Sequence, residues 1–235
     1  MANRPFAELA HGLARHGIAT LRYDKRTYVY HDLNAITIRE ETIDDALSAI
    51  SLAVGLHPGG PVYVIGHSLG ATLAPWIAKL APQLRGIVMM AAAARPMDEL
   101  IEEQIRYLSP SGASQEFIDG QVAAAKARSP QYFEGEMASY DRVQTAQSLG
   151  LPILILQGER DYQVRMTDFR LWQQALSGHS AVEFHSYPAL NHLFHESISP
   201  GTLSSPIDYQ TEGTIPTQVI DDIARFILTS AASSD

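Results

Sequence analysis

The apolar residues of the chain follow two repeating patterns. Positions that recur at helical spacing predict helices near 4–16, 43–54, 69–81, 166–177 and 216–229. Short continuous runs rich in β-branched and aromatic residues predict strands at 18–23, 61–65, 86–93, 152–158 and 181–187. Because strands alternate with helices, the sequence predicts an α/β fold with a mostly parallel sheet of about five strands, covered by helices on both faces.

Two long stretches depart from this alternation. Residues 94–148 contain only helical patterns, so we expect a helical insertion between two strands of the sheet. Residues 193–215 are mostly polar and contain neither pattern. Loops longer than about 15 residues are usually functional or mobile, so this segment is of interest for the site.

Composition and charge exclude several classes of partner and chemistry. The 235 residues have a net charge of −9 and no basic cluster, so neither nucleic acid nor an anionic membrane surface is an expected partner. The absence of cysteine excludes disulfides and thiolate chemistry. The first residues lack the apolar core of a signal peptide, and no apolar run approaches the roughly 20 residues needed to span a bilayer, so we expect a cytoplasmic protein.

The segment "VYVIGHSLGATLA" at 62–74 joins a predicted strand to a predicted helix through a Gly-x-Ser-x-Gly turn. Gly66 and Gly70 permit a tight, strained turn that exposes Ser68 above the end of the sheet. The free N–H groups of the helix start lie beside the serine and favour an oxyanion. The turn and its context therefore predict that Ser68 is a nucleophile.

A serine nucleophile needs a base, and the base needs an acid that orients it. Asp161 follows the buried run "PILILQG", and His192 follows the last predicted strand. Both lie at the carboxyl ends of strands, where open α/β sheets place their ligands. We expect His192 to take the proton of Ser68, and Asp161 to hold the imidazole and stabilise its charged form.

Other residues compete for these roles. Asp168 lies inside a predicted helix and is expected to be a solvated surface residue, while His195 is the main alternative to His192. His67, inside the turn, is expected to pack or hydrogen-bond locally rather than act as a base. The remaining histidines show no spacing typical of metal ligands.

The segments "GHSLG", "LILQGERDYQV" and "YPALNHLF", in this order, resemble the α/β-hydrolase superfamily, and "ATLRYDKRTYVYHD" resembles its dienelactone-hydrolase and prolyl-oligopeptidase-like esterases. The resemblance implies a three-layer core formed by 1–93 and 149–235, with 94–148 as a lid. It also implies a Ser-His-Asp hydrolase with neither a metal nor an organic cofactor. Tyr107 and Tyr140 would either line the acyl pocket of such an enzyme or pack within the lid.

The expected activity is that of a carboxylesterase that cleaves small, short-acyl esters through an acyl-enzyme. Thioesterase, lactonase, peptidase and C–C hydrolase activity on the same triad remain alternatives. A non-catalytic hydrolase-fold binding protein or fragment is the competing class. None of these motifs specifies the acyl chain, the alcohol or the natural substrate.

The printed sequence lacks the first three strands of that family and its His-Gly-rich loop. The N–H of Leu69 is expected to serve as one oxyanion donor, and loss of a second donor typically lowers the rate by about 10² to 10³. The missing strand would leave unpaired backbone between 18–23 and 62–65. Either these strands close up into a five-stranded sheet or another chain covers the edge, and we expect a homodimer.

Overall fold

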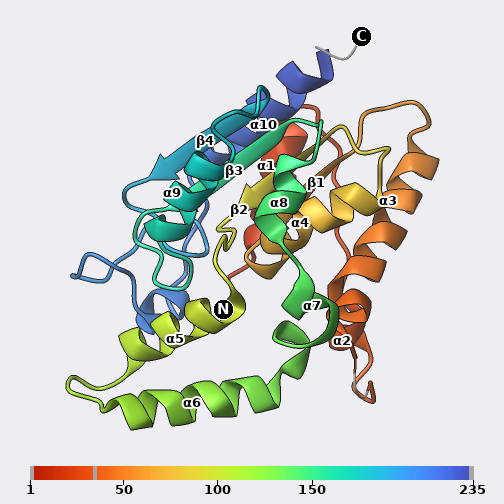
Figure 1. The fold of residues 1–235 in the computed structure, drawn as a ribbon. Helices are drawn as coiled ribbons and strands as arrows, with labels where there is room; N and C mark the ends of the chain where they lie inside the picture. Colours follow the sequence, from red (N-terminus) through yellow and green to blue (C-terminus); the bar gives the residue numbers. More distant parts are fainter. Residues whose placement is uncertain (1–2, 34–35, 233–235) are drawn as a thin grey trace.

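The computed structural model describes residues 3–33 and 36–232 and places a parallel sheet at the centre of the molecule (Figure 1). The strands are β1 (Tyr63–His67), β2 (Gly86–Met90), β3 (Ile153–Gly158) and β4 (Val182–Tyr187). They lie in the order β1-β2-β3-β4, and every neighbouring pair is parallel. The mostly parallel sheet of an α/β fold is therefore confirmed, with four strands in the described residues.

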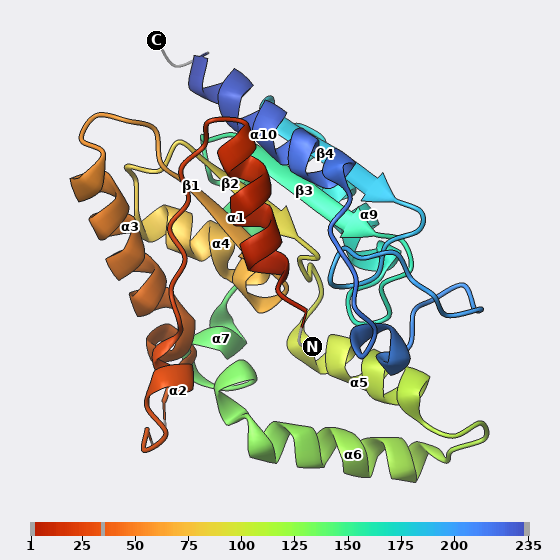
Figure 2. The same cartoon turned by 180° about the vertical axis from the view of Figure 1, so that it is seen from behind.

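Helices cover both faces of the sheet and complete three layers. Helices α1 (Pro5–Arg15) and α10 (Thr217–Ala232) pack against each other on one face (Figure 2). The other face carries α3 (Asp44–Leu56), α4 (Leu69–Leu80), α8 (Arg142–Gln147) and α9 (Met166–Ala175). The side chains of β2 and β3 alternate between the two layers, as a doubly covered parallel sheet requires.

This alternation is visible in two neighbouring residues of β2. Ile87 packs in the cluster under α4 and α9, whereas Val88 packs in the cluster under α1 and α10, and both side chains are fully buried. The strand therefore has no polar position, which explains why its sequence is a continuous apolar run rather than an alternating one.

The chain between β2 and β3 forms helices and no strand in the described residues. These are α5 (Met97–Leu108), α6 (Gln115–Arg128), the 3-10 turn η2 (Pro130–Tyr132), α7 (Gly135–Ser139) and α8. Figures 1 and 2 show α5, α6 and α7 beyond the end of the sheet toward which the strands point. The last helix, α8, instead packs against α4 in the core layer.

The strand expected at 18–23 does not form. This segment is irregular, and residues 19–23 are exposed. Residues 18–23 do not pair with β1, whose outer edge has no paired strand among the described residues. Without a paired strand, the backbone groups of this segment bond to water instead. The segment therefore gains no stability from an extended conformation.

Irregular segments connect the remaining elements. The chain from α1 to α3 contains the short helix α2 (Arg26–Val29) and a π-helical turn, η1 (Arg39–Ile43). The polar stretch after β4 contains only the 3-10 turn η3 (Pro206–Tyr209) before α10. Within 3–33 and 36–232, no helix is long and apolar enough to cross a bilayer.

Candidate active site

Ser68 lies in a strained turn between β1 and α4. Its backbone has φ of 54° and ψ of −117°, a left-handed conformation that is uncommon for a residue with a side chain. A Cβ at Gly66 would lie only 2.4 Å from the carbonyl oxygen of Gly70, so the turn requires glycine at 66. The strained turn that the sequence predicts at Ser68 is therefore the geometry found here.

Backbone hydrogen bonds fix this turn to the neighbouring strand. The N–H of Ser68 donates to the carbonyl oxygen of Met90 at 2.9 Å. The hydroxyl of Thr72 donates to the carbonyl oxygen of Ser68 at 3.0 Å and accepts the N–H of Ala93 at 3.0 Å. Thr72 therefore ties the turn to the chain leaving β2, a role for which the sequence gives no signal.

Asp161 lies in the loop that follows β3 and is fully buried. Its Oδ1 accepts the N–H groups of Gln163 and Val164 at 2.7 and 3.1 Å. Its Oδ2 accepts the side-chain amide of Gln157 at 3.3 Å and lies 2.7 Å from Nδ1 of His192. Four donors thus hold a buried carboxylate in one orientation, facing the histidine.

His192 lies in the loop after β4 and is only 4% exposed. Because the Asp161 carboxylate only accepts hydrogen bonds, Nδ1 of His192 carries the proton in this pair. The neutral ring then has a free lone pair on Nε2, the atom that a general base uses. The structure thus brings together Asp161 and His192, the residues predicted as acid and base.

The hydroxyl of Ser68 makes no hydrogen bond within the described part of the chain. The ring of His192 nevertheless lies beside the turn, because its centroid is 4.7 Å from that of His67, the residue before Ser68. Catalytic hydrogen bonds are often long in a ligand-free protein and tighten when substrate binds. The geometry therefore joins Asp161 and His192 directly and brings the ring of His192 to the turn that carries Ser68.

The two competing residues lie elsewhere. His195 is buried at 2% exposure and faces Glu8 of α1, with Nε2 at 3.6 Å from the carboxylate, and burial lowers its pKa. Asp168 is fully buried, which contradicts the expectation of a solvated surface residue. Its carboxylate binds the guanidinium of Arg95 at 2.8 Å and accepts the N–H of Ala94 at 3.0 Å.

The burial of Asp168 has a physical reason that helical periodicity alone does not reveal. Arg95 lies at the start of the insertion, and its positive charge compensates the buried carboxylate. Arg142, at the start of α8, donates to the carbonyl oxygen of Arg95 at 2.7 Å. The two ends of the insertion thus meet at Arg95, which Asp168 holds, so Asp168 anchors the insertion and lies apart from the pair of Asp161 and His192.

Tyr107 and Tyr140 attach the insertion to the segments that carry Asp161 and Ser68. Tyr107 stacks on Tyr162 with ring centroids 5.2 Å apart, and its hydroxyl donates to the carbonyl oxygen of Ser204 at 2.9 Å. Tyr140 packs on Trp76 of α4, and its hydroxyl donates to the carbonyl oxygen of Thr72 at 3.1 Å. Both rings therefore pack against aromatic residues outside the insertion rather than within it.

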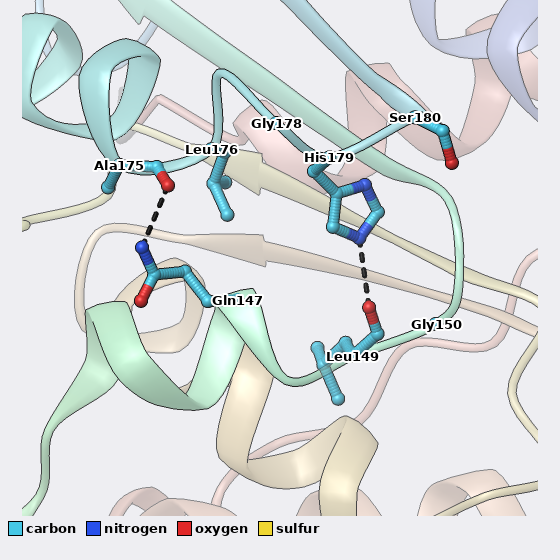
Figure 3. Close-up of a pocket in the computed structure, with 8 residues that line it drawn as sticks. All are labelled: Gln147, Leu149, Gly150, Ala175, Leu176, Gly178, His179 and Ser180. Atoms are coloured by element: carbon cyan, nitrogen blue, oxygen red, sulfur yellow. Dashed lines mark hydrogen bonds between the residues drawn. The ribbon is translucent and has the colours of Figure 1, made fainter.

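A hollow at the opposite end of the sheet is separate from these residues. Figure 3 shows it between the segments that precede β3 and β4, with His179 and Gln147 pointing across it. The imidazole of His179 bonds the carbonyl oxygen of Leu149 at 2.9 Å, and the amide of Gln147 donates to Ala175 at 2.8 Å. The side chains of His179 and Gln147 thus already pair with protein atoms. Within the described residues, no three His, Cys, Asp or Glu side chains cluster as metal ligands would.

Comparison with known proteins gives matches to hydrolases. The family model described as serine aminopeptidase, S33, matches residues 3–114. The esterase EstD of Thermotoga maritima is 35% identical over 239 residues, which cover 96% of this chain. The chain spans only 57% of the length of that relative.

Solved esterases have a similar fold at low sequence identity. The esterase Pf2001 of Pyrococcus furiosus superposes with a TM-score of 0.61 at 14% identity, over 97% of this chain and 77% of the other. Est1E of Butyrivibrio proteoclasticus, solved with ferulic acid bound, gives 0.59 at 15% identity, over 98% and 84%. These structures confirm the three-layer fold inferred from the sequence.

Proposed function

We propose that this chain is a member of the α/β-hydrolase superfamily and a serine carboxylesterase that cleaves small, short-acyl esters with Ser68, His192 and Asp161. The observation that carries the proposal is the 2.7 Å contact between His192 Nδ1 and Asp161 Oδ2, beside the strained turn at Ser68. The 35% identity to the esterase EstD supports the same reaction class.

The proposed reaction has two halves. Ser68 Oγ attacks the carbonyl carbon of the ester while Nε2 of His192 takes its proton. The tetrahedral intermediate collapses, the bond to the alcohol oxygen breaks, and His192 returns the proton to the leaving alcohol. Water then attacks the acyl-enzyme with His192 as base, and the carboxylic acid leaves as Ser68 regains its proton.

Leu69 is the proposed source of one oxyanion donor. It is the first residue of α4, and the first N–H groups of a helix have no partner within the helix. The positive end of the helix dipole adds to this stabilisation of an oxyanion. Removing one oxyanion donor typically lowers turnover by about 10² to 10³, which is the size of the contribution proposed for this N–H.

An aminopeptidase-like activity on the same residues is the second candidate, because the matching family model is described as serine aminopeptidase. Two substrates that share an acyl group but differ in the leaving group distinguish the two activities. We expect hydrolysis of amino-acid p-nitrophenyl esters with little hydrolysis of the corresponding p-nitroanilides. Faster turnover of the anilides would favour the peptidase.

We also propose a role for the helical insertion and an oligomeric state for the chain. We infer that residues 94–148 act as a lid on the core formed by 1–93 and 149–235. A homodimer would cover the outer edge of β1, which has no paired strand in the described residues. Light scattering at micromolar concentration tests the dimer, and a monomer there would contradict it. A cytoplasmic location stays a prediction.

The proposed reaction is tested with short p-nitrophenyl esters. We expect turnover by the wild type and loss of at least about 10³-fold in kcat for Ser68→Ala, since the acyl-enzyme cannot form. Ser148→Ala in the loop after α8 is a matched control that removes a hydroxyl away from the site. Equal rates for Ser68→Ala and the wild type would contradict the assignment of the nucleophile.

A further inference from the structure

The ring of His67 makes a hydrogen bond that links the serine turn to the histidine loop. Its Nε2 lies 2.7 Å from the main-chain carbonyl oxygen of His192. A carbonyl oxygen only accepts, so Nε2 of His67 carries the proton and donates. The residue directly before Ser68 thus holds the backbone of the residue proposed as its base.

The surroundings of His67 fix the ring in this position. The rings of Phe6 and Phe194 contact it edge-on, with centroids 6.0 and 6.4 Å away. The third ring in contact is that of His192 itself, tilted by 53°. Aromatic neighbours on these sides leave the ring little freedom to change its rotamer, so its N–H stays directed at the carbonyl oxygen.

The charge state of His67 suits a hydrogen-bond donor to the His192 carbonyl oxygen rather than a second general base. Burial, reinforced by repulsion from His192, lowers its pKa from 6.5 to about 4. The imidazole is therefore neutral near neutral pH and donates one hydrogen bond from Nε2 without adding a charge beside the reaction. A base with so low a pKa is a weak acceptor for a serine proton at neutral pH, where the best general bases have a pKa near the working pH.

We propose that His67 is a positioning residue that fixes the orientation of His192 through its main-chain carbonyl. Two hydrogen bonds hold His192: Asp161 binds the ring at Nδ1, and His67 binds the main-chain carbonyl oxygen. Loss of the second hydrogen bond lets the ring swing about the loop and away from Ser68. The proposal rests on the catalytic roles given above, but the hydrogen bond itself can be tested without turnover.

Three substitutions separate a positioning role from simple packing. His67→Phe keeps an aromatic ring and removes the donor. In His67→Gln the amide nitrogen stands as many bonds from the backbone as Nε2 does, whereas in His67→Asn it stands at the distance of Nδ1. Only the glutamine variant can therefore donate to the His192 carbonyl. His11→Phe on the exposed side of α1 is the control for replacing a histidine by phenylalanine.

Misplacing a reacting group by about 1 Å costs about 10²-fold in rate, so we expect His67→Phe to lower kcat by about 10- to 100-fold with KM changed less than about 3-fold. His67→Asn should resemble it. His67→Gln should recover kcat to within about 5-fold of the wild type. A folded glutamine variant no faster than the asparagine variant would overturn the proposal, as would a phenylalanine variant that keeps the wild-type kcat.

Proton NMR gives a reading that does not depend on activity. The Nδ1 proton of His192, in its bond to Asp161, should give a far-downfield resonance in the wild type and in His67→Gln. That resonance should broaden or vanish in His67→Phe and His67→Asn, because a swinging ring exposes the proton to water. Should the wild type fail to hydrolyse esters, the proposed function fails, and the resonance alone decides the role of His67. An unchanged resonance in all four proteins would contradict that role.

Discussion

Nδ1 of His192 lies 2.7 Å from Oδ2 of Asp161, and the carboxylate faces the imidazole with no freedom to turn, since backbone N–H groups of Gln163 and Val164 hold its other oxygen. In a serine hydrolase this arrangement selects the tautomer that leaves Nε2 free for the serine proton. The geometry therefore makes the tautomer of His192 depend on one carboxylate.

Replacing Asp161 by asparagine tests this dependence. The amide of Asp161→Asn can donate to Nδ1 of His192, which moves the imidazole proton to Nε2 and removes the base. We expect kcat for ester hydrolysis to fall by about 10³ to 10⁴ with little change in KM. Asp119→Asn, an exposed carboxylate in α6, is the matched control. A kcat within about 10-fold of the wild type would mean that another residue orients His192.

The buried pair of Asp168 and Arg95 predicts a large effect on stability. Asp168→Asn removes the charge that compensates Arg95, whose side chain is only 15% exposed. Breaking a buried pair from one side costs about 3 to 5 kcal/mol, and Glu103 remains as a second partner, so we expect a loss of about 3 kcal/mol in the free energy of unfolding. Urea unfolding measures it.

Glu102→Gln provides the control for that measurement. Glu102 pairs with Arg106 on the exposed side of α5, and both side chains are about half exposed. Such a pair contributes about 0.3 to 0.5 kcal/mol, so this variant should unfold close to the wild type. Equal losses for the two variants would show that Asp168 does not anchor the insertion.

Stability should fall with acid because of His67. In the unfolded chain its imidazole takes up a proton below pH 6.5, whereas in the folded protein it stays neutral down to about pH 4. The unfolded state therefore binds more protons between these values, and stability that is complete above pH 6.5 is lost as the pH falls through this window. The contribution of His67 is about 3 kcal/mol.

His67→Gln removes the titrating group and should flatten this dependence. We expect the difference in unfolding free energy between about pH 7 and about pH 4.5 to be smaller by about 2 kcal/mol than in the wild type. The pKa of His195 is also lowered by burial, so part of the acid sensitivity remains in both proteins. Parallel stability curves for the two proteins would contradict the burial of a neutral His67.

Tyr140 is expected to affect stability rather than substrate choice. Tyr140→Phe removes the hydrogen bond to the Thr72 carbonyl and keeps the ring packed on Trp76. The loss should be about 1 kcal/mol in unfolding free energy. The ratio of kcat/KM for acetyl and butyryl esters should change by less than about 3-fold, since the hydroxyl is turned to α4. A changed acyl preference with unchanged stability would instead place Tyr140 in the acyl pocket.

The sequence was sufficient for those parts of the fold and site that depend on local rules. A glycine-bounded serine between a strand and a helix fixes a turn, and the ends of parallel strands share one edge of the sheet. Ser68, Asp161 and His192 each follow a strand in this way. Their common location could therefore be predicted without knowledge of any contact.

Other features depend on distant partners and could not be predicted in this way. Asp168 has the sequence context of an exposed helical residue, and only the position of Arg95 explains its burial. The segment 18–23 has the composition of a strand, but a strand also needs a paired neighbour. Local composition does not show whether one is present. The bond from His67 to the His192 carbonyl joins residues 125 positions apart, and neither residue type indicates it.

Labelling with a fluorophosphonate tests the central claim most directly. The reagent reacts only with a serine whose hydroxyl is activated, and it needs a less complete oxyanion hole than ester turnover does. The account predicts a single adduct, mapped by mass spectrometry of peptides to Ser68 in the wild type and absent from Ser68→Ala. Asp161→Asn should label far more slowly. An unlabelled Ser68 in a protein that hydrolyses esters, or an adduct on a different serine, would contradict the account.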